Sequence, residues 1–99
     1  MKRLFAVIRT RGPAWQASLK MEAQLDWTAH ADFMTNLHDE GFVLLVGPLL
    51  KTQDVLLIIR AESADEIASR LADDPWTPMG LVEIKRIDAW DLRLGKLAW

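Results

Sequence analysis

Nearly half of the hydrophobic residues in this chain fall into four short runs. The runs are rich in Val, Ile, Leu and Phe and are bounded by glycine, proline or polar turn residues, which is typical of strands. They read RLFAVIRT, FVLLVGPLL, VLLIIRA and GLVEIKRIDAW. We therefore predict strands at residues 2–10, 42–50, 55–61 and 80–90, with a break in the second strand at Gly47–Pro48.

A helix is predicted between the first two strands, because apolar residues and one histidine recur there at i, i+3 and i+4 spacing. The face that this spacing creates carries Trp27, His30, Phe33, Met34 and Leu37. Asp26 is a typical N-cap residue, and Gly41 is typical of the position just after a helix. The histidine therefore lies on the buried side of a helix, which calls for an explanation.

A second helix is predicted from its N-terminal signal. Ser63, followed three residues later by Glu66, forms a capping box. The helix has to end near Asp73, because Asp74 precedes a proline and is disfavoured in the helical region.

Two segments show no period, namely residues 11–25 and a C-terminal tail at about 91–99. The large side chains of Trp15 and Met21 argue against disorder in the first. We assign Trp90 and Trp99 to packing of the tail or of a dimer. No linker or repeat divides residues 1–99, which we expect to form one domain.

The order of the predicted elements is βαββαβ, an α+β arrangement of ferredoxin-like type. Right-handed crossovers place both helices on one face of a four-stranded antiparallel sheet. The first three strands are apolar at nearly every position, whereas a sheet covered on one face should alternate. The bare face therefore predicts contact with another protein surface, most simply a homodimer through the sheet face.

Composition excludes several classes of protein. Hydrophobic residues make up 51% of the chain, a large share for so few residues to bury alone, which again favours a dimer. The net charge is −2 and no basic patch is evident, so we expect no nucleic-acid partner. With no cysteine and two histidines, the sequence argues against a metal site. The apolar runs are too short to span a bilayer and the N-terminus lacks a signal-peptide cleavage site, so we expect no membrane contact and a cytoplasmic location.

The chain direction brings the unusual residues to one end of the molecule, where the first helix begins and the second ends. A carboxylate that accepts a hydrogen bond from one imidazole nitrogen fixes the tautomer and leaves the other nitrogen for a substrate. His30 and Asp74 are therefore the candidate catalytic pair. An apolar aromatic wall beside them would suit a flat ligand. The candidate substrate-binding residues are Trp15, Trp27, Met34, Gly47, Pro48, Pro75 and Trp76.

Several short motifs recur in an order and spacing that are fairly specific together. They are GPAW at 12–15, W..HA.FM..L at 27–37, GF at 41–42, GPL at 47–49, ADDPW at 72–76, GL at 80–81 and W...LG at 90–95. On these motifs the chain resembles, over nearly its whole length, the YCII-related (YciI-like) proteins, small ferredoxin-like domains that pair into dimeric α/β barrels. The resemblance implies an active-site His–Asp pair, which maps onto His30 and Asp74. One relative type is a dehydrochlorinase of a chlorinated aromatic compound, and most members have no assigned reaction. Val46 stands where the resemblance leads us to expect a glycine, and its side chain would narrow the pocket mouth.

Two classes of function stay open at this point. The first is a small-molecule lyase or isomerase that moves protons on an aromatic or enol-like compound, or dehydrochlorinates it, with His30 as general acid–base and Asp74 as its orienter. The second is a non-catalytic, dimeric ligand-binding or accessory protein, since a histidine on an apolar helix face is more often a core residue. Asp74 also suits a turn before Pro75. No cofactor is predicted, and an oxygenase of similar fold that uses heme or quinol is a weaker third option. An open pocket with one free His30 nitrogen would favour the first class.

Overall fold

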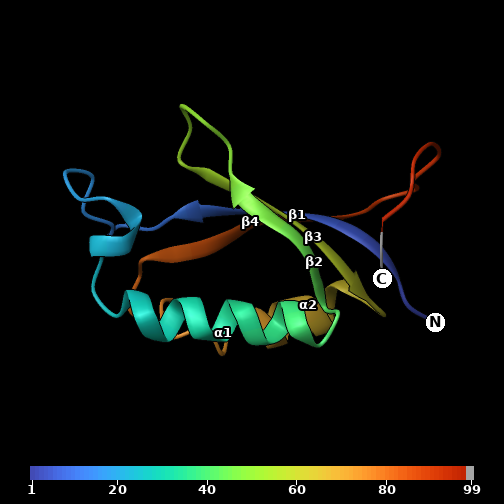
Figure 1. Ribbon diagram of the computed structural model, residues 1–99, viewed down its shortest axis with the longest axis horizontal. Coiled ribbons are helices and arrows are strands. Elements are labelled where there is room, and N and C mark those ends of the chain that lie inside the picture. The colour runs from blue at the N-terminus through green and yellow to red at the C-terminus, as the bar shows by residue number, and fades with distance from the viewer. Residues whose placement is uncertain (98–99) are drawn as a thin grey trace.

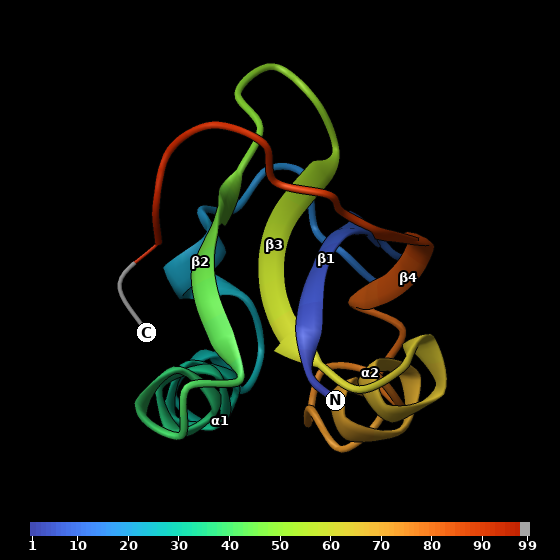
Figure 2. The same cartoon turned by 90° about the vertical axis from the view of Figure 1, so that its right-hand side faces the viewer.

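The protein consists of a sheet with two helices packed under one face (Figures 1 and 2). The computed structural model describes residues 1–97. In chain order the elements are β1 (Arg3–Arg11), η1 (Met21–Ala23), α1 (Trp27–Asp39), β2 (Val43–Pro48), β3 (Asp54–Ala61), α2 (Ala64–Leu71) and β4 (Val82–Ala89). The strands pair antiparallel in the order β2-β3-β1-β4. The predicted ferredoxin-like fold is confirmed, apart from η1, a short 3-10 turn that the sequence pattern did not indicate.

The core lies between the sheet and the helices because side chains alternate along each strand. β1 directs Phe5 and Val7 toward the helices, and β3 directs Leu57 and Ile59 the same way. The layer is completed from the helices by Leu37, Ile67 and Leu71. Each fully buried side chain of this kind stabilises the fold by roughly 1.5–3 kcal/mol relative to exposure.

The strand boundaries differ from the prediction by one or two residues, except at the end of β3. β1 runs one residue further, so that Arg11 pairs with Val82 of β4. β2 stops at Pro48 because the Leu49 carbonyl accepts a hydrogen bond from Thr52 N at 3.2 Å, which closes a turn. β4 begins only at Val82, after Gly80 with its φ of +72°.

Both helices start where the sequence predicts, but only one of them has the predicted capping hydrogen bond. Asp26 is the N-cap residue of α1, but its φ of +57° is left-handed and its side chain makes no capping hydrogen bond, so the predicted capping role is wrong. At α2 the Ser63 hydroxyl accepts from Glu66 N at 3.1 Å, as a capping box requires. The Glu66 carboxylate accepts from Glu62 N at 2.8 Å rather than from the backbone of Ser63.

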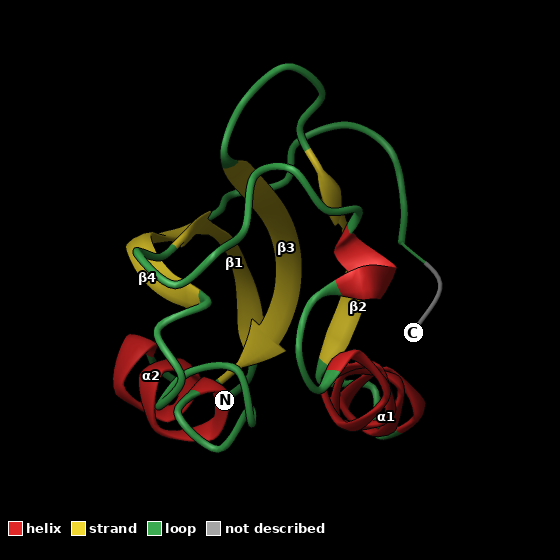
Figure 3. Ribbon diagram, turned by 90° about the vertical axis from the view of Figure 1, so that its left-hand side faces the viewer, coloured by secondary structure: helices red, strands yellow, loops and turns green. Residues whose placement is uncertain are grey.

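Residues 12–25 form an ordered loop above the start of α1 (Figure 3). Gln24 holds it: its amide donates to the carbonyls of Gln16 at 2.8 Å and Leu19 at 3.2 Å, and its oxygen accepts from Gln16 N at 3.1 Å. Only 4% of Gln24 is exposed. Since a buried amide without partners is costly, these bonds fix the loop that carries Trp15.

The sheet face opposite the helices is apolar near its centre and charged at β4. Ile8 and Leu56 are paired neighbours on this face, and Leu45 of β2 is exposed. The outward residues of β4 are Glu83, Lys85, Arg86 and Asp88. The C-terminal tail runs on the same side of the sheet (Figure 2). Trp90 is partly exposed there, and the assignment made for Trp99 lies outside the described residues. No helix within residues 1–97 is both long and apolar enough to cross a bilayer.

Candidate active site

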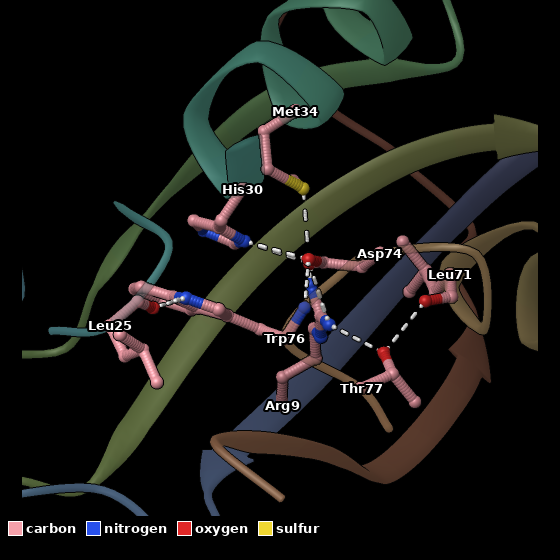
Figure 4. A network of polar contacts seen from close by, with 8 residues as sticks. All are labelled: Arg9, Leu25, His30, Met34, Leu71, Asp74, Trp76 and Thr77. Carbon is pink, nitrogen blue, oxygen red and sulfur yellow. Dashed lines mark hydrogen bonds and ion pairs between the residues drawn. The ribbon is translucent and has the colours of Figure 1, made fainter. Parts of the chain in front are cut away.

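His30 and Asp74 meet at the end of the molecule where α1 begins and α2 has ended (Figure 4). His30 Nδ1 lies 2.8 Å from one Asp74 oxygen and 3.0 Å from the other. The contact forms because His30 lies one turn into α1 on its inner face, while Asp74 lies on the link between α2 and β4. An ionised carboxylate can only accept, so Nδ1 carries the proton and Nε2 of the neutral ring is left as an acceptor.

The Asp74 carboxylate is fully buried and accepts from two further donors. Trp76 N donates to it at 2.9 Å, and Arg9 Nη2 lies 3.0 Å away in an ion pair. Arg9 is itself only 4% exposed and also reaches the Thr77 hydroxyl at 3.4 Å. The site is therefore a three-residue charged cluster rather than an isolated His–Asp pair.

Sequence reasoning missed Arg9, although a signal for it is present. Phe5, Val7, Arg9 and Arg11 are alternate residues of one strand and therefore share the face that packs on the helices. A charged residue at a core-facing position is rarely left unpaired, so Arg9 indicated a buried acid elsewhere in the chain.

The electrostatics of Asp74 keep it ionised. Burial alone would raise its pKa, but hydrogen bonds from His30 and the Trp76 backbone, together with the Arg9 charge, outweigh burial and hold the pKa of Asp74 below its ordinary value. Burial lowers the pKa of Arg9 while Asp74 opposes that shift, and a guanidinium remains charged at neutral pH in either case. Asp74 thus offers His30 a permanent negative partner.

Trp76 fixes the plane of the His30 ring. The two rings are stacked, with centroids 3.8 Å apart and an angle of 5° between planes. The Trp76 indole is itself anchored, because its Nε1 donates to the Leu25 carbonyl at 2.7 Å. Trp15 contacts the Trp76 ring edge-on at 5.6 Å, and Trp27 lies 5.8 Å from both His30 and Trp76. The imidazole is therefore constrained by a hydrogen bond on its edge and by an aromatic ring on its face.

A cavity of about 340 Å³ opens beside His30 and is lined mainly by apolar side chains. Of the residues predicted from the sequence, the lining includes Trp15, Trp27, His30, Met34, Gly47, Pro48 and Trp76. Asp74 and Pro75 do not line it: Asp74 is fully buried, and Pro75 lies in the chain between Asp74 and Trp76. The lining residues that sequence reasoning did not select include Arg9, Arg11 and Met21. Val46 also lines the cavity, at the position where the family pattern led us to expect glycine.

The second nitrogen of His30 is free within the described part of the chain. Nε2 makes no hydrogen bond to residues 1–97 and is not among their enclosed, unpartnered atoms. Since His30 lines the cavity, Nε2 is the atom able to exchange a proton with a bound compound. Residues 1–97 contain no group of three His, Asp or Glu side chains placed to hold a metal ion.

Comparison with known proteins identifies the family. The model of the YCII-related domain matches residues 4–91. The chain belongs to the YCII-related domain family. The match includes every strand and helix of this YCII-related domain except the first residue of β1, and it confirms the resemblance found in the motifs.

One solved structure similar to this YCII-related domain is an enzyme. It is 5-chloro-2-hydroxyhydroquinone dehydrochlorinase from Burkholderia phenoliruptrix AC1100, in complex with 2,5-dihydroxybenzoquinone. The two chains share 27% sequence identity with a TM-score of 0.67, and the alignment covers 89% of this chain and 93% of the other. No curated protein matches the chain.

Proposed function

We propose that this YCII-related domain is a small-molecule enzyme of the lyase or isomerase type, and that His30 Nε2 transfers the proton. The observation that supports this most directly is a histidine with one nitrogen held by a buried carboxylate and the other free beside a cavity. His30 is the catalytic residue of the proposal because it alone of the pair lines the cavity. Asp74 is a positioning residue, which acts by fixing the tautomer and orientation of the imidazole.

The proposed reaction is balanced without a cofactor. His30 Nε2 accepts a proton from a ring carbon or a hydroxyl group of an aromatic or enol-like compound. The electrons of the broken bond form a new double bond, and either a leaving group such as chloride departs or the proton returns to a different atom. The dehydrochlorinase with which the chain shares its fold supports the first outcome, the loss of hydrogen chloride.

A substitution at His30 tests this proposal. The protein is incubated with chlorinated hydroxyhydroquinones, beginning with the 5-chloro compound, and chloride release is measured against time. His30→Gln should lower kcat by about 100-fold or more, since general acid–base catalysis contributes on the order of 10²–10⁴-fold. Asp74→Asn should lose less, because the imidazole remains but its tautomer is no longer fixed.

Turnover by His30→Gln equal to that of the wild type would remove His30 from the mechanism. If 2,5-dihydroxybenzoquinone binds but no compound of the series is turned over, the domain is instead a ligand-binding or accessory protein. His38→Gln, the same substitution at the other histidine, which does not line the cavity and contacts the Val43 carbonyl, is the matched control and should leave turnover within a few-fold of the wild type.

The proposal includes a homodimer formed through the sheet face opposite the helices. Its support is the apolar centre of that face, where Ile8, Leu56 and the exposed Leu45 lie. A second copy would bury these side chains, whereas a single chain leaves the face open to water. Light scattering at micromolar protein concentration should return twice the chain mass of 11.3 kDa, and a monomer mass would contradict the dimer.

A further inference from the structure

β1 ends in two arginines that both face the cavity. Arg9 and Arg11 continue the alternation of Phe5 and Val7, so their side chains lie on the helix side of the sheet. Both line the cavity, although it is otherwise mostly apolar. Each of these two cations, on the face of β1 that packs on the helices, would be stabilised by a negatively charged group.

Only one of these cations has a carboxylate. Arg9 is paired with Asp74 at 3.0 Å. Arg11 makes no ion pair within residues 1–97, and its guanidinium carbon lies 4.4 Å from the centroid of the Trp15 ring. Arg11 Nε is enclosed without an acceptor, whereas the two terminal nitrogens are neither enclosed nor hydrogen-bonded. The terminal N–H groups of Arg11 are therefore available donors.

The charge of the cavity follows from these contacts. No aspartate or glutamate is among the described residues that line it. The charges of Arg9 and Asp74 cancel, so the Arg11 charge is left uncompensated when the His30 ring is neutral. A cation beside apolar walls is stabilised when it binds an anion. The N–H groups of a guanidinium match the oxygens of carboxylates and phenolates.

We propose that Arg11 determines specificity in this cavity, by binding an aromatic or enol-type compound through an anionic oxygen, either carboxylate or phenolate. The inference rests on the proposed function and deepens it, because it names the class of compound that His30 would act on. The rings connect the two ends of the site. Arg11 lies over Trp15, Trp15 meets Trp76 edge-on at 5.6 Å, and Trp76 stacks on His30 at 3.8 Å. A ligand anchored on Arg11 would thus extend along this aromatic wall toward His30.

Binding of benzoate and benzamide tests the role of Arg11, because the two compounds have nearly the same shape and differ in charge. Each is titrated into the protein while the indole N–H signals of Trp15 and Trp76 are followed by NMR. The wild type should bind benzoate at least roughly tenfold more tightly than benzamide, since a charge-assisted hydrogen bond contributes more than a neutral one. Arg11→Gln should lose that preference and keep its benzamide affinity, and Arg11→Lys should retain part of it.

Arg86→Gln is the matched control, because it removes the same charge from an exposed residue of β4 that is paired with Asp88. It should keep the preference of the wild type. Equal affinities in the wild type, an unchanged preference in Arg11→Gln, or signal changes confined to sites away from Trp15 and Trp76 would each overturn the role of Arg11. So would the absence of benzoate binding up to its solubility limit. The readout is binding alone, so the proposed function fails by a different result, namely unchanged turnover in His30→Gln.

Discussion

Replacing Asp74 with asparagine removes one negative charge from a fully buried position and changes the shape of the side chain little. The carboxylate accepts from His30 Nδ1 at 2.8 Å, Trp76 N at 2.9 Å and Arg9 Nη2 at 3.0 Å. Asparagine keeps one oxygen acceptor, but its amide nitrogen is a donor. At least one of the three donors therefore loses its partner, and the buried guanidinium loses its counter-charge.

The expected loss of stability is large. Removing one partner of a buried ion pair costs roughly 3–5 kcal/mol, because the other charge stays buried without compensation. A domain of this size is stable by only about 5–15 kcal/mol, so Asp74→Asn should be folded but markedly weakened. Urea denaturation at pH 7 and a fixed protein concentration should show the difference as a lower free energy of unfolding.

Acid should reduce the difference in the free energy of unfolding between the wild type and Asp74→Asn. The folded-state pKa of Asp74 is held below its ordinary value of 3.8, so the unfolded chain takes up the proton first as the pH falls. The stabilisation is complete above the ordinary pKa and is lost as the pH falls through the lower folded-state pKa. The advantage of the wild type over Asp74→Asn should therefore shrink in that acidic range.

A second substitution separates the ion pair from other effects of the change. Arg9→Met combined with Asp74→Asn removes the stranded cation, so the double variant should be more stable than Asp74→Asn alone. If Asp74→Asn alone does not fold, folding of the double variant still tests the effect of the stranded cation. Asp54→Asn is the control, since its partner Lys85 is exposed and such pairs contribute little. A loss below about 1 kcal/mol in Asp74→Asn, or a double variant no more stable than the single, would refute the reasoning.

Three further predictions concern the loop, two glycines and the sheet face. Gln24→Ala should destabilise the protein by about 1–3 kcal/mol and speed amide hydrogen exchange in residues 12–25, because it removes three hydrogen bonds of a buried amide. Gly12→Ala should lower the thermal midpoint, because its Cβ would lie 2.2 Å from the Gly80 carbonyl oxygen. Gly47→Ala should leave that midpoint nearly unchanged, because no atom outside its two chain neighbours lies within 4 Å of the added carbon. Leu56→Lys should convert the proposed dimer to monomers or aggregates by light scattering, since burying an unpaired charge costs several kcal/mol.

The fold followed from the sequence because its signals are local and mutually consistent. Strand-forming runs, the Ser63 capping box and the helical stripe around His30 each fix one element, and the handedness rule then leaves few topologies. The chain direction was enough to place His30 and Asp74 at the same end. The cytoplasmic location and the dimer were also inferred from the sequence, and they stay predictions.

The features that sequence reasoning missed depend on contacts between distant segments. Arg9 was treated as part of an apolar strand, although it pairs with a residue that lies far along the chain. Gln24 looked like an ordinary loop residue, and its burial arises only when the loop folds back on itself. The left-handed Asp26 shows that a residue type favoured at a cap can occupy the position without making the bond. In each case the local pattern was compatible with more than one partner, and tertiary packing decided between them.

The strand order has a consequence for how this site comes into existence during synthesis. β1 carries Arg9 and Arg11, yet its neighbours in the sheet are β3 and β4 rather than β2. During synthesis β1 therefore cannot pair with β3 until residues 54–61 have emerged, and its other edge stays open until residues 82–89 have followed. Asp74 also appears late, so Arg9 and His30 spend this interval without their shared counter-charge. A chain that stopped before β4 would leave β1 as an open edge of the sheet. Binding of a ligand at this site would therefore indicate that β4 has docked.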